Sequence, residues 1–589
     1  MRFFSSKSGS VYQPPPLAGR PPIAGWHESA PRVGERRGWL IRARARAAVL
    51  ALAGACLLSA ASIVLLGSRL TFFNDEWYVL LLRPGLSAGT LLEPHNGHLS
   101  AAPILIYKGL VAGFGLDDQI PFRITLAAVV TALGALVFAF VRERAGDLLA
   151  LLAAALVIFL GPAWQDLLWS FQIGLVGSLA AGVATLLALE RQTRRGDLLA
   201  CLLLVVGIAF SNLGVAFIVA AAVAVLIRDR RSGLWVPALP ALLFVLWLVA
   251  YGHSAQVGFS WENVARTPAY VLDAIAAGLA SMTGLSAGAG GDPQPYAYGR
   301  PLLALLVIGT VLWIGRGARP SRRVLPIAAA ALTFWVLLAV SFIPNWREPE
   351  TSRYQLISVT FLLLILAELF RPVRLSRAAL GAIAAAAAIA IAANLVALRD
   401  GYRLLRAESA IARADLGALD IGRGLIPPDF RLRHAIAGSP YLTGVYAGPY
   451  YRERDAHGSP AYTPAEIAAA RGPAPRVADV VLGSAYGLRL APTPATAARG
   501  TDCRVLAPGS PGGRGVLRLP RGGARLANLG TSAAELRLRR FSPAFPLHLG
   551  RLAAGAQARL SIPPDAAARP WTLAVSGGAP VRVCATARG

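Results

Sequence analysis

Long apolar runs recur through the first two thirds of the sequence and constrain the fold more than any other feature. The run at residues 47–67 carries no charge and is long enough to cross about 30 Å of hydrocarbon at about 1.5 Å per helical residue. Hydrophobic residues make up 55% of the chain and charged residues only 15%, whereas about a quarter of the residues in soluble proteins are charged. The sequence therefore excludes an ordinary soluble protein and predicts an all-α polytopic membrane body.

The basic residues indicate how this body lies in the membrane. They outnumber the acidic residues 58 to 31 and give a net charge of +27. Nucleic acid, anionic lipid and membrane topology can each explain such a balance, but no nucleic-acid-binding module is recognisable in the sequence. Because Lys and Arg gather in cytoplasmic loops, we expect four inner loops at 142–147, 191–197, 228–233 and 316–323, and a fifth Arg-bearing connection, 371–377, joins the last two runs.

Between these fixed points the apolar runs define the spans. We expect them at 47–67, 122–141, 147–163, 173–190, 234–252, 300–316, 324–343, 354–370 and 377–398. Residues 198–227 have arginines at both ends and so cross twice, with an outer turn at Ser211 and Asn212. The run at 98–115 starts and ends outside by the same rule, and we expect an amphipathic interfacial or re-entrant helix there. About eleven crossings leave the N-terminus in the cytoplasm and the C-terminus outside.

Composition divides the chain into three parts. Residues 1–46 are rich in Pro, Gly, Ser and Arg and predict a disordered cytoplasmic tail, because they hold too little apolar surface to fold. Residues 47–398 form the transmembrane domain, whose first run we interpret as an anchor rather than a cleaved signal peptide because the polar leader before it is long. Residues 399–589 form an extracytoplasmic soluble domain.

The soluble domain is expected to begin with a helix over 402–420 and to continue as a small β-sandwich. Its strands are indicated by segments in which apolar and polar residues alternate: RVADVV, GVLRLP, AELRLRR, ARLSI and TLAVSG. Cys503 and Cys584 lie near the ends of this region, and an exported location permits a disulfide between them. Sequence spacing alone leaves the bridged and the free forms both open.

Two adjacent acids follow the first span. Asp75 and Glu76 stand where the chain leaves the outer leaflet, and such a pair suits a catalytic base and its tuning partner. Partial burial and a neighbouring negative charge both raise the pKa of a carboxyl group, so one of the two can take a proton near neutral pH. A solvated loop beside an interfacial belt of Trp77 and Tyr78 explains the same residues, and the sequence leaves both interpretations open.

A stretch rich in hydrogen-bonding side chains comes next. Glu93, His95 and His98 lie close together, and Lys108 follows on the same interfacial segment. Two histidines and a carboxylate suit a divalent metal, but hydrogen bonding to a sugar or a phosphate is the interpretation we favour. No cofactor is indicated with certainty, and a divalent metal stays open. Asp166, between tryptophans on another outer loop, suits sugar binding too, while an interfacial belt accounts for the tryptophans themselves.

Arginines on the outer side break the charge rule that the inner loops follow. Arg347, Arg353 and Tyr354 lie at the loop before the last span but one, together with Glu348 and Glu350. A lipid-linked phosphate would explain them, because a guanidinium group binds phosphate oxygens through two parallel hydrogen bonds. An Arg–Glu pair that holds the loop together is the alternative.

These motifs together resemble the C-type (GT-C) glycosyltransferase superfamily, which includes protein O-mannosyltransferases and lipid A aminoarabinose transferases. The resemblance rests on the acidic pair after the first span, the His-containing stretch, the PFRI segment that opens the next span, the SRYQL segment that opens a late span, and the broken helix pair around Ser211 and Asn212. It covers residues 47–398. The family's usual His-Pro-Pro stretch stands here as His-Asn-Gly-His, and the C-terminal sandwich is not a shared feature.

The resemblance implies an activity and roles for several residues. Such enzymes take a sugar from a polyprenyl phosphate and transfer it, with inversion, to an acceptor on the outer face. Asp75 would be the base that deprotonates the acceptor, and Glu76 would orient the acceptor or the base. Arg353, with Arg347, would hold the donor phosphate and stabilise the leaving charge. We therefore expect a cell-membrane glycosyltransferase whose partners are a polyprenyl-phosphate sugar and a glycan, lipid or protein acceptor of the cell envelope.

Two other classes of protein fit parts of the sequence. A transporter or lipid-handling protein would carry ionisable residues inside its spans, whereas the acids and arginines here stand at the outer ends. This position favours surface chemistry over transport. A non-catalytic envelope assembly protein, in which the soluble domain does the binding, also fits the sequence.

Overall fold

The computed structural model describes residues 33–228, 231–252, 259–286, 295–432, 442, 444–494, 502–508, 515–576 and 578–585. Residues 1–49 and 50–589 form two units. Helix α1 (Val33–Gly67) begins in the first unit, so residues 33–46 are helical where we expected the end of a disordered tail. Arg and Ala are good helix formers and extend the apolar helix toward its N-terminus. The rest of the predicted tail, residues 1–32, lies outside the described part of the chain.

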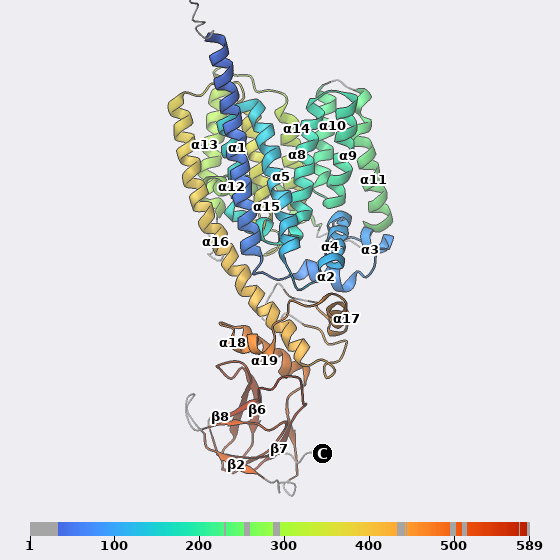
Figure 1. Cartoon of the computed structure of the whole chain (residues 1–589), viewed down its shortest axis with the longest axis vertical. Coiled ribbons are helices and arrows are strands. Elements are labelled where there is room, and N and C mark those ends of the chain that lie inside the picture. The colour runs from blue at the N-terminus through green and yellow to red at the C-terminus, as the bar shows by residue number, and fades with distance from the viewer. Residues whose placement is uncertain are drawn as a thin grey trace, which may run out of the picture. The chain divides into compact units, whose positions relative to one another are not determined.

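Apolar helices dominate the fold (Figure 1). Among the described residues, seven helical stretches are long and apolar enough to cross a membrane: Ala45–Gly67, Ile120–Ala145, Asp147–Leu168, Ser170–Glu190, Tyr298–Gly315, Ser352–Leu369 and Arg377–Ile421. Four shorter helices are also apolar: Ala101–Phe114, Gly214–Ile227, Trp235–Tyr251 and Val324–Val340. The chain is a multi-pass membrane protein, as its sequence predicted.

Each predicted span overlaps a helix of the bundle. After α1, the helices are α5 (Ile120–Ala145), α6 (Asp147–Ile158), η1 (Gly161–Ala163), α7 (Trp164–Leu168), η2 (Ser170–Gln172), α8 (Ile173–Glu190), α9 (Arg194–Phe210), α10 (Gly214–Ile227), η3 (Arg231–Gly233), α11 (Trp235–Tyr251), α12 (Trp261–Thr283), α13 (Pro295–Gly315), α14 (Val324–Val340), α15 (Ser352–Leu369) and α16 (Arg377–Ile421). The predicted break at Ser211 and Asn212 separates α9 from α10. We did not predict α12, because Glu262, Arg266 and Asp273 interrupt its apolar residues.

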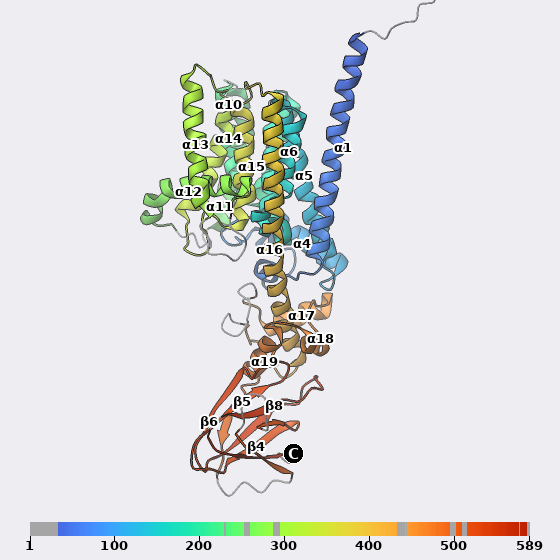
Figure 2. The same ribbon diagram turned by 90° about the vertical axis from the view of Figure 1, so that its left-hand side faces the viewer.

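Helix α16 joins two helices that the sequence predicted. We expected a span over 377–398 and a separate helix over 402–420, whereas α16 runs unbroken through both (Figure 2). It passes Trp164 of α7 at Gly401, where a Cβ atom would lie 2.2 Å from the indole ring. Gly401 therefore lets the helix continue past the ring. Trp164 is buried by this contact, so it is not part of an interfacial belt.

Three short helices lie together at one end of the bundle (Figure 1): α2 (Asn74–Leu82), α3 (Ala88–Leu92) and α4 (Ala101–Phe114). The 14 residues of α4 extend about 21 Å, which is less than the thickness of the hydrocarbon layer. The helix predicted over 98–115 is present, and its place in the membrane interface stays a prediction. Helix α17 (Ala447–His457) packs against α2, and its Tyr450 ring lies 6.1 Å from the ring of Trp77.

The C-terminal region combines helices with two antiparallel sheets. Its other helices are α18 (Pro464–Ala469) and α19 (Ala474–Ala485). The strands are β1 (Leu490–Pro492), β2 (Cys503–Leu506), β3 (Val516–Arg518), β4 (Gly522–Asn528), β5 (Ala534–Arg539), β6 (Leu547–Leu552), β7 (Gln557–Ile562), β8 (Thr572–Ser576) and β9 (Val581–Ala585). They are ordered β1-β7-β4-β9-β2 in one sheet and β3-β8-β5-β6 in the other. Four of the five predicted strand segments are strands of these sheets.

The fifth predicted segment, RVADVV, is wrong because it lies in α19. Val477 and Val481, one helical turn apart, are both buried. Asp479 is buried between them and accepts backbone hydrogen bonds of 2.9–3.1 Å from residues 540–542. The alternating pattern of apolar and polar residues suggested a strand. The buried carboxylate of Asp479 is instead satisfied by the three backbone N–H groups of residues 540–542, a tertiary contact that the local sequence does not reveal.

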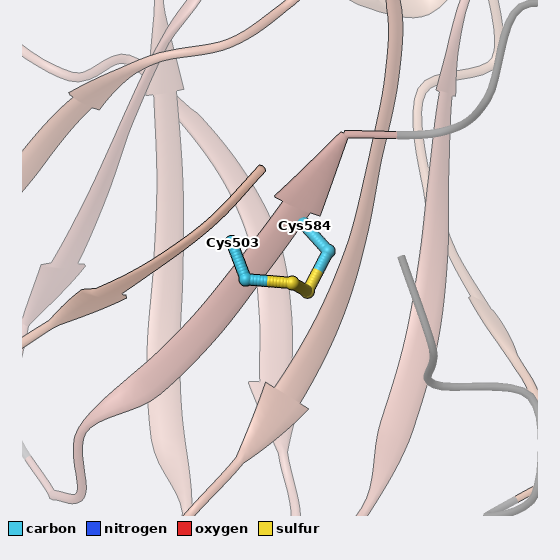
Figure 3. Close-up of a disulfide and its surroundings, with 2 residues drawn as sticks. All are labelled: Cys503 and Cys584. Carbon is cyan, nitrogen blue, oxygen red and sulfur yellow. A yellow bond between two sulfur atoms is a disulfide. The ribbon is translucent and has the colours of Figure 1, made fainter. Parts of the chain in front are cut away.

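A disulfide joins Cys503 of β2 to Cys584 of β9 (Figure 3). The two residues are direct partners in the register of the two strands, and their Cα atoms are 4.0 Å apart. The bridge that the sequence left open is therefore present. Cys56 and Cys201 are free.

Removal of the bridge should loosen the five-stranded sheet that contains β2 and β9. Its cysteines are 81 residues apart in sequence, and closing a loop of such length contributes about 2–4 kcal/mol to stability. We expect a protease to cleave the β-rich region of the purified full-length variant Cys503→Ala/Cys584→Ala at a lower temperature than in the wild type. Cys56→Ala/Cys201→Ala is the matched control and should digest like the wild type. Equal digestion of all three proteins would contradict a stabilising role for the bridge.

Candidate functional site

Helix α2 presents the two adjacent acids to different surroundings. Asp75 and Glu76 lie in its first turn, and consecutive side chains of a helix point about 100° apart. Glu76 is fully buried, whereas the Asp75 side chain is 20% exposed. The acidic pair of the sequence is thus divided between the protein interior and the wall of a cavity.

Glu76 fixes the start of α2. Its Oε2 accepts the backbone N–H of Phe73 at 2.7 Å and the indole N–H of Trp169 at 3.2 Å. Its Oε1 accepts the hydroxyl group of Tyr107 at 2.5 Å. Burial raises the pKa of Glu76 to about 7, against the lowering effects of the Arg123 charge and of these hydrogen bonds. Glu76 therefore anchors the helix that carries Asp75.

Asp75 faces a cavity of about 280 Å³. Its Oδ1 accepts a hydrogen bond from Asn96 Nδ2 at 2.8 Å and lies 3.3 Å from His95 Nε2. Burial by itself would raise the pKa of Asp75, but the hydrogen bond and charge of His95 and the hydrogen bond of Asn96 hold it below its usual value. Asp75 is therefore ionised at neutral pH, and a carboxylate that lines the cavity can accept a hydrogen bond from a bound hydroxyl group.

The residues that contact Asp75 belong to a tight turn. His95 and His98 exchange two backbone hydrogen bonds of 2.9 Å. Asn96 and Gly97 between them have φ angles of 50° and 81°. Asn-Gly is a preferred pair for such a turn, because both positions need a positive φ. The His-Asn-Gly-His stretch of the sequence therefore directs His95 and Asn96 toward Asp75.

Asn212, in the break between α9 and α10, fastens this turn to the bundle. Its Oδ1 accepts the N–H of Leu99, and its Nδ2 donates to the carbonyl group of Gly97, each at 2.9 Å. We had placed Asn212 in an outer turn without a role in the site. The signal for that role was a polar amide inside an otherwise apolar stretch, where it needs a partner from another segment.

Two arginines line the same cavity. Arg353 donates from Nη2 to the carbonyl group of Trp346 at 2.8 Å, and its guanidinium lies 5.2 Å and 5.3 Å from the ring centres of Trp346 and Tyr354. Arg347 donates from Nη1 to the carbonyl group of Ser341 at 2.9 Å. A backbone carbonyl group thus holds each guanidinium group, and two aromatic rings lie beside that of Arg353. These contacts do not cancel the two positive charges.

The Arg–Glu pair considered for this loop does not occur among the residues that the structure describes. Glu348 accepts a backbone N–H within its own loop at 2.9 Å. Oε2 of Glu350 is buried without a hydrogen-bond partner, and burial raises the pKa of Glu350. The acids whose charges act on Arg353 are Asp75 and Asp166. A structural pair in the loop is therefore not the reason for these two arginines.

The cavity brings together six of the ten candidate residues: Asp75, His95, His98, Arg347, Arg353 and Tyr354. The other four lie elsewhere. Glu76 is buried beneath α2, and Lys108 donates to the backbone carbonyl of Arg83. Glu93 is exposed at the end of α3, and Asp166 is fully buried in α7 with both carboxylate oxygens lacking a hydrogen-bond partner. These four residues are close to the other candidates in sequence, but their side chains do not line the cavity.

The rest of the cavity wall is mainly apolar and aromatic. The wall includes Pro103, Phe171, Phe210, Phe334, Leu337 and Leu338, none of which we had assigned to the site. His98 is neutral there at physiological pH, because burial, together with the charge of Arg347, lowers its pKa to about 4. A neutral imidazole both donates and accepts hydrogen bonds. The cavity thus combines an anion, two cations, a neutral imidazole and an apolar wall.

His95 contacts Asp75 and two aromatic rings. Among the described residues, no three His, Cys, Asp or Glu side chains are grouped as metal ligands. The His95 ring lies 5.1 Å from the Tyr78 ring and 5.3 Å from the Phe171 ring, and its Nε2 faces Asp75. These contacts orient His95 toward the carboxylate. The divalent metal stays an expectation from the sequence.

Comparison with solved structures identifies proteins of similar fold. The chain is 13% identical to ArnT from Cupriavidus metallidurans bound to undecaprenyl phosphate, with a TM-score of 0.40 over 70% of this chain and 89% of ArnT. It is 13% identical to the arabinosyltransferase EmbB from Mycobacterium smegmatis, with a TM-score of 0.33 over 90% of this chain and 64% of EmbB. No protein-family model and no curated protein matches the chain.

The buried carboxyl group of Glu76 should make the stability of the protein depend on pH. Its pKa is about 7 in the folded protein and 4.5 for an ordinary Glu, so the folded state holds this proton more tightly than the unfolded state. Its contribution to stability is complete below pH 4.5 and is lost as the pH rises to about 7. Glu76→Gln, which does not titrate, should abolish this loss of up to about 3 kcal/mol.

Thermal unfolding of the wild type and Glu76→Gln in lipid nanodiscs, between pH 4.5 and 7.5, measures this difference. His98 acts in the opposite direction, since its lowered pKa makes its contribution complete above pH 6.5 and lost toward pH 4. Both proteins contain His98, so its effect cancels in the comparison. A difference in unfolding temperature that stays constant with pH would contradict a proton held on Glu76.

Proposed function

We propose that the protein is an integral membrane glycosyltransferase that moves a sugar from a polyprenyl-phosphate donor to an acceptor of the cell envelope. The observation that carries the proposal is the content of one cavity: an ionised carboxylate, Asp75, and two guanidinium groups, Arg347 and Arg353, beside an apolar wall. Sugar transfer from a lipid phosphate requires a base, a stabilised anionic leaving group and a place for the lipid.

Each group has a place in a single displacement. The acceptor hydroxyl oxygen attacks the anomeric carbon of the donor sugar while Asp75 takes the hydroxyl proton. The bond between the anomeric carbon and the phosphate oxygen breaks, and its electron pair leaves with the polyprenyl phosphate. Arg347 and Arg353 stabilise the charge that develops on that phosphate. One displacement inverts the anomeric carbon.

The turn and the apolar wall support this step. The hydrogen bond from Asn96 orients the Asp75 carboxylate, and neutral His98 suits hydrogen bonds to sugar hydroxyl groups. Phe334, Leu337 and Leu338 of α14 offer apolar surface near the arginines, which suits the first isoprene units of the donor. A free sugar nucleotide would gain nothing from that surface.

The proposed orientation follows from the charged loops. The connections rich in arginine stand at the ends of the helices away from α2 and the cavity, and such loops favour the cytoplasm. We therefore place the cavity and the C-terminal domain on the extracytoplasmic side and the N-terminus in the cytoplasm. The acceptor would then reach Asp75 from outside the cell membrane.

Asp75→Asn should reduce sugar transfer by a factor of about 10²–10⁴, because the amide keeps the size of the side chain but does not take a proton. The assay uses purified full-length protein in nanodiscs, radiolabelled polyprenyl-phosphate sugars and cell-envelope acceptors, with and without EDTA. Glu93→Gln, the same change at an exposed acid outside the cavity, is the control and should transfer at the wild-type rate. Equal rates for Asp75→Asn and the wild type would remove Asp75 from the role of base.

Arg353→Ala should weaken binding of a polyprenyl phosphate by about tenfold or more, since a charge-assisted pair with the phosphate is lost. Arg353→Lys keeps the positive charge but not the two parallel hydrogen bonds that a guanidinium group donates, so this variant should bind the polyprenyl phosphate with intermediate affinity. Arg266→Ala removes an exposed arginine that pairs with Glu262 on α12 and serves as the control.

Binding to the purified protein is measured by fluorescence with a labelled polyprenyl phosphate. Unchanged binding by Arg353→Ala would exclude this arginine as the phosphate ligand. Donor binding that is followed by movement of the lipid between leaflets, and never by sugar transfer, would favour the lipid-handling alternative. A wild type that binds no polyprenyl phosphate would favour the assembly protein.

A further inference from the structure

A second cavity, of about 200 Å³, lies at the other ends of helices that line the first. Helix α8 contributes Leu175 to the first cavity and Leu189 to the second, and α14 contributes Leu338 to the first and Pro326 to the second. These separations of 14 residues along α8 and 12 residues along α14 correspond to about 21 Å and about 18 Å. The two cavities therefore lie near opposite faces of the membrane that these helices cross.

Arginines dominate the polar lining of the second cavity. The lining holds four arginines and one glutamate: Arg144, Arg228, Arg322, Arg323 and Glu190. The Arg144 side chain is 2% exposed, pairs with Glu190, and lies 2.5 Å from Glu368 Oε2. Its Nη1 donates to the carbonyl group of Phe140 at 2.7 Å, and its guanidinium covers the Phe140 ring. Arg144 is thus a fixed and charge-balanced part of the wall.

The arginines at the start of α14 differ from Arg144. Arg322 and Arg323 are exposed, and no carboxylate of the described residues forms an ion pair with either of them. They stand at a helix N-terminus, where the helix dipole adds to the positive potential. Arg228 is fixed in the same lining by a hydrogen bond of 2.7 Å to the carbonyl group of Leu189. The cavity therefore has a surplus of positive charge at its rim.

Apolar side chains make up the remaining wall. They come from four helices and include Phe140, Leu186, Ala224, Ile227 and Ile327. A free inorganic anion would gain nothing from this surface. A ligand that suits both the rim and the wall is anionic at one end and apolar at the other.

We propose that this cavity binds the phosphate headgroup of an anionic phospholipid from the leaflet on that side. The phosphate oxygens would accept hydrogen bonds from the guanidinium groups at the rim, and the first carbons of the acyl chains would pack on the apolar wall. Cavities with this chemistry between transmembrane helices suit anionic headgroups, which lie at the ends of the helices. The proposal is independent of sugar transfer, because it uses no residue of the first cavity.

Native mass spectrometry of the detergent-purified full-length protein, titrated with dioleoylphosphatidylglycerol or dioleoylphosphatidylcholine, tests the proposal. We expect the wild type to retain phosphatidylglycerol in preference to phosphatidylcholine. Arg322→Ala/Arg323→Ala should weaken binding of phosphatidylglycerol by about tenfold or more. Arg316→Ala/Arg319→Ala removes the same charge from exposed residues of the same connection outside the cavity and should bind like the wild type.

Two further variants separate the cavity from surface charge and from the first cavity. Ala224→Leu narrows the cavity without changing its charge and should also weaken binding of phosphatidylglycerol. In an Arg353→Ala background, Arg322→Ala/Arg323→Ala should cause the same fold loss as in the wild type. Unchanged thermal unfolding shows that each variant keeps its fold.

Three results would overturn the proposal. Equal binding of phosphatidylglycerol and phosphatidylcholine by the wild type would show no selection for an anionic headgroup. Equal losses in the two double arginine variants would assign binding to general surface charge. Displacement of phosphatidylglycerol by millimolar inorganic phosphate would assign the cavity to a free anion rather than to a lipid.

Discussion

Hydrocarbon offers no hydrogen-bond partner to a polypeptide, so the polar groups of a membrane-crossing chain are satisfied within helices or collect where helices end. This constraint explains where the chemistry of the protein lies. Asp75, the turn at His95 and Arg353 come from three separate helix starts and loops, yet they meet at one end of the bundle. The arginines of the second cavity meet at the other end. Apolar lengths of α8, α10 and α14 separate the two sets of groups.

Much of the fold followed from the sequence because membrane helices are encoded locally. Arginines between apolar runs were enough to find the spans and the break before Gly214. Helix α12 was not predicted because three charged residues interrupt its apolar sequence. The helix that contains Asp479 was not predicted because it depends on a contact with residues 540–542, which are distant in the sequence. The disulfide was open in the sequence for the same reason: the register of β2 against β9 is what brings the sulfurs together.

The sequence predicted part of the membership of the cavity but not the different surroundings of its two acids. Residue types pointed to Asp75, the histidines and the outer arginines, and one cavity contains them. The residues alone left open which of Asp75 and Glu76 takes a proton, and only the resemblance assigned that role to Asp75. In the structure Asp75 faces the cavity, whereas Glu76 lies among buried hydrogen-bond donors. Asn212 was not predicted as a site residue because its hydrogen-bond partners, Gly97 and Leu99, lie more than a hundred residues earlier in the sequence.

The unbroken helix α16 runs from the bundle into the C-terminal region. Its 45 residues correspond to about 68 Å, more than twice the thickness of the hydrocarbon layer. Along this length Gly401 meets Trp164, and Ser409 accepts the backbone N–H of Thr71 just before α2. Each residue added or removed between these two contacts would turn one relative to the other by about 100°. The number of residues between Gly401 and Ser409 therefore fixes both the distance between the two contacts and their relative rotation about the axis of α16. A relative with a different C-terminal domain would have to keep this number of residues to hold α2 in place.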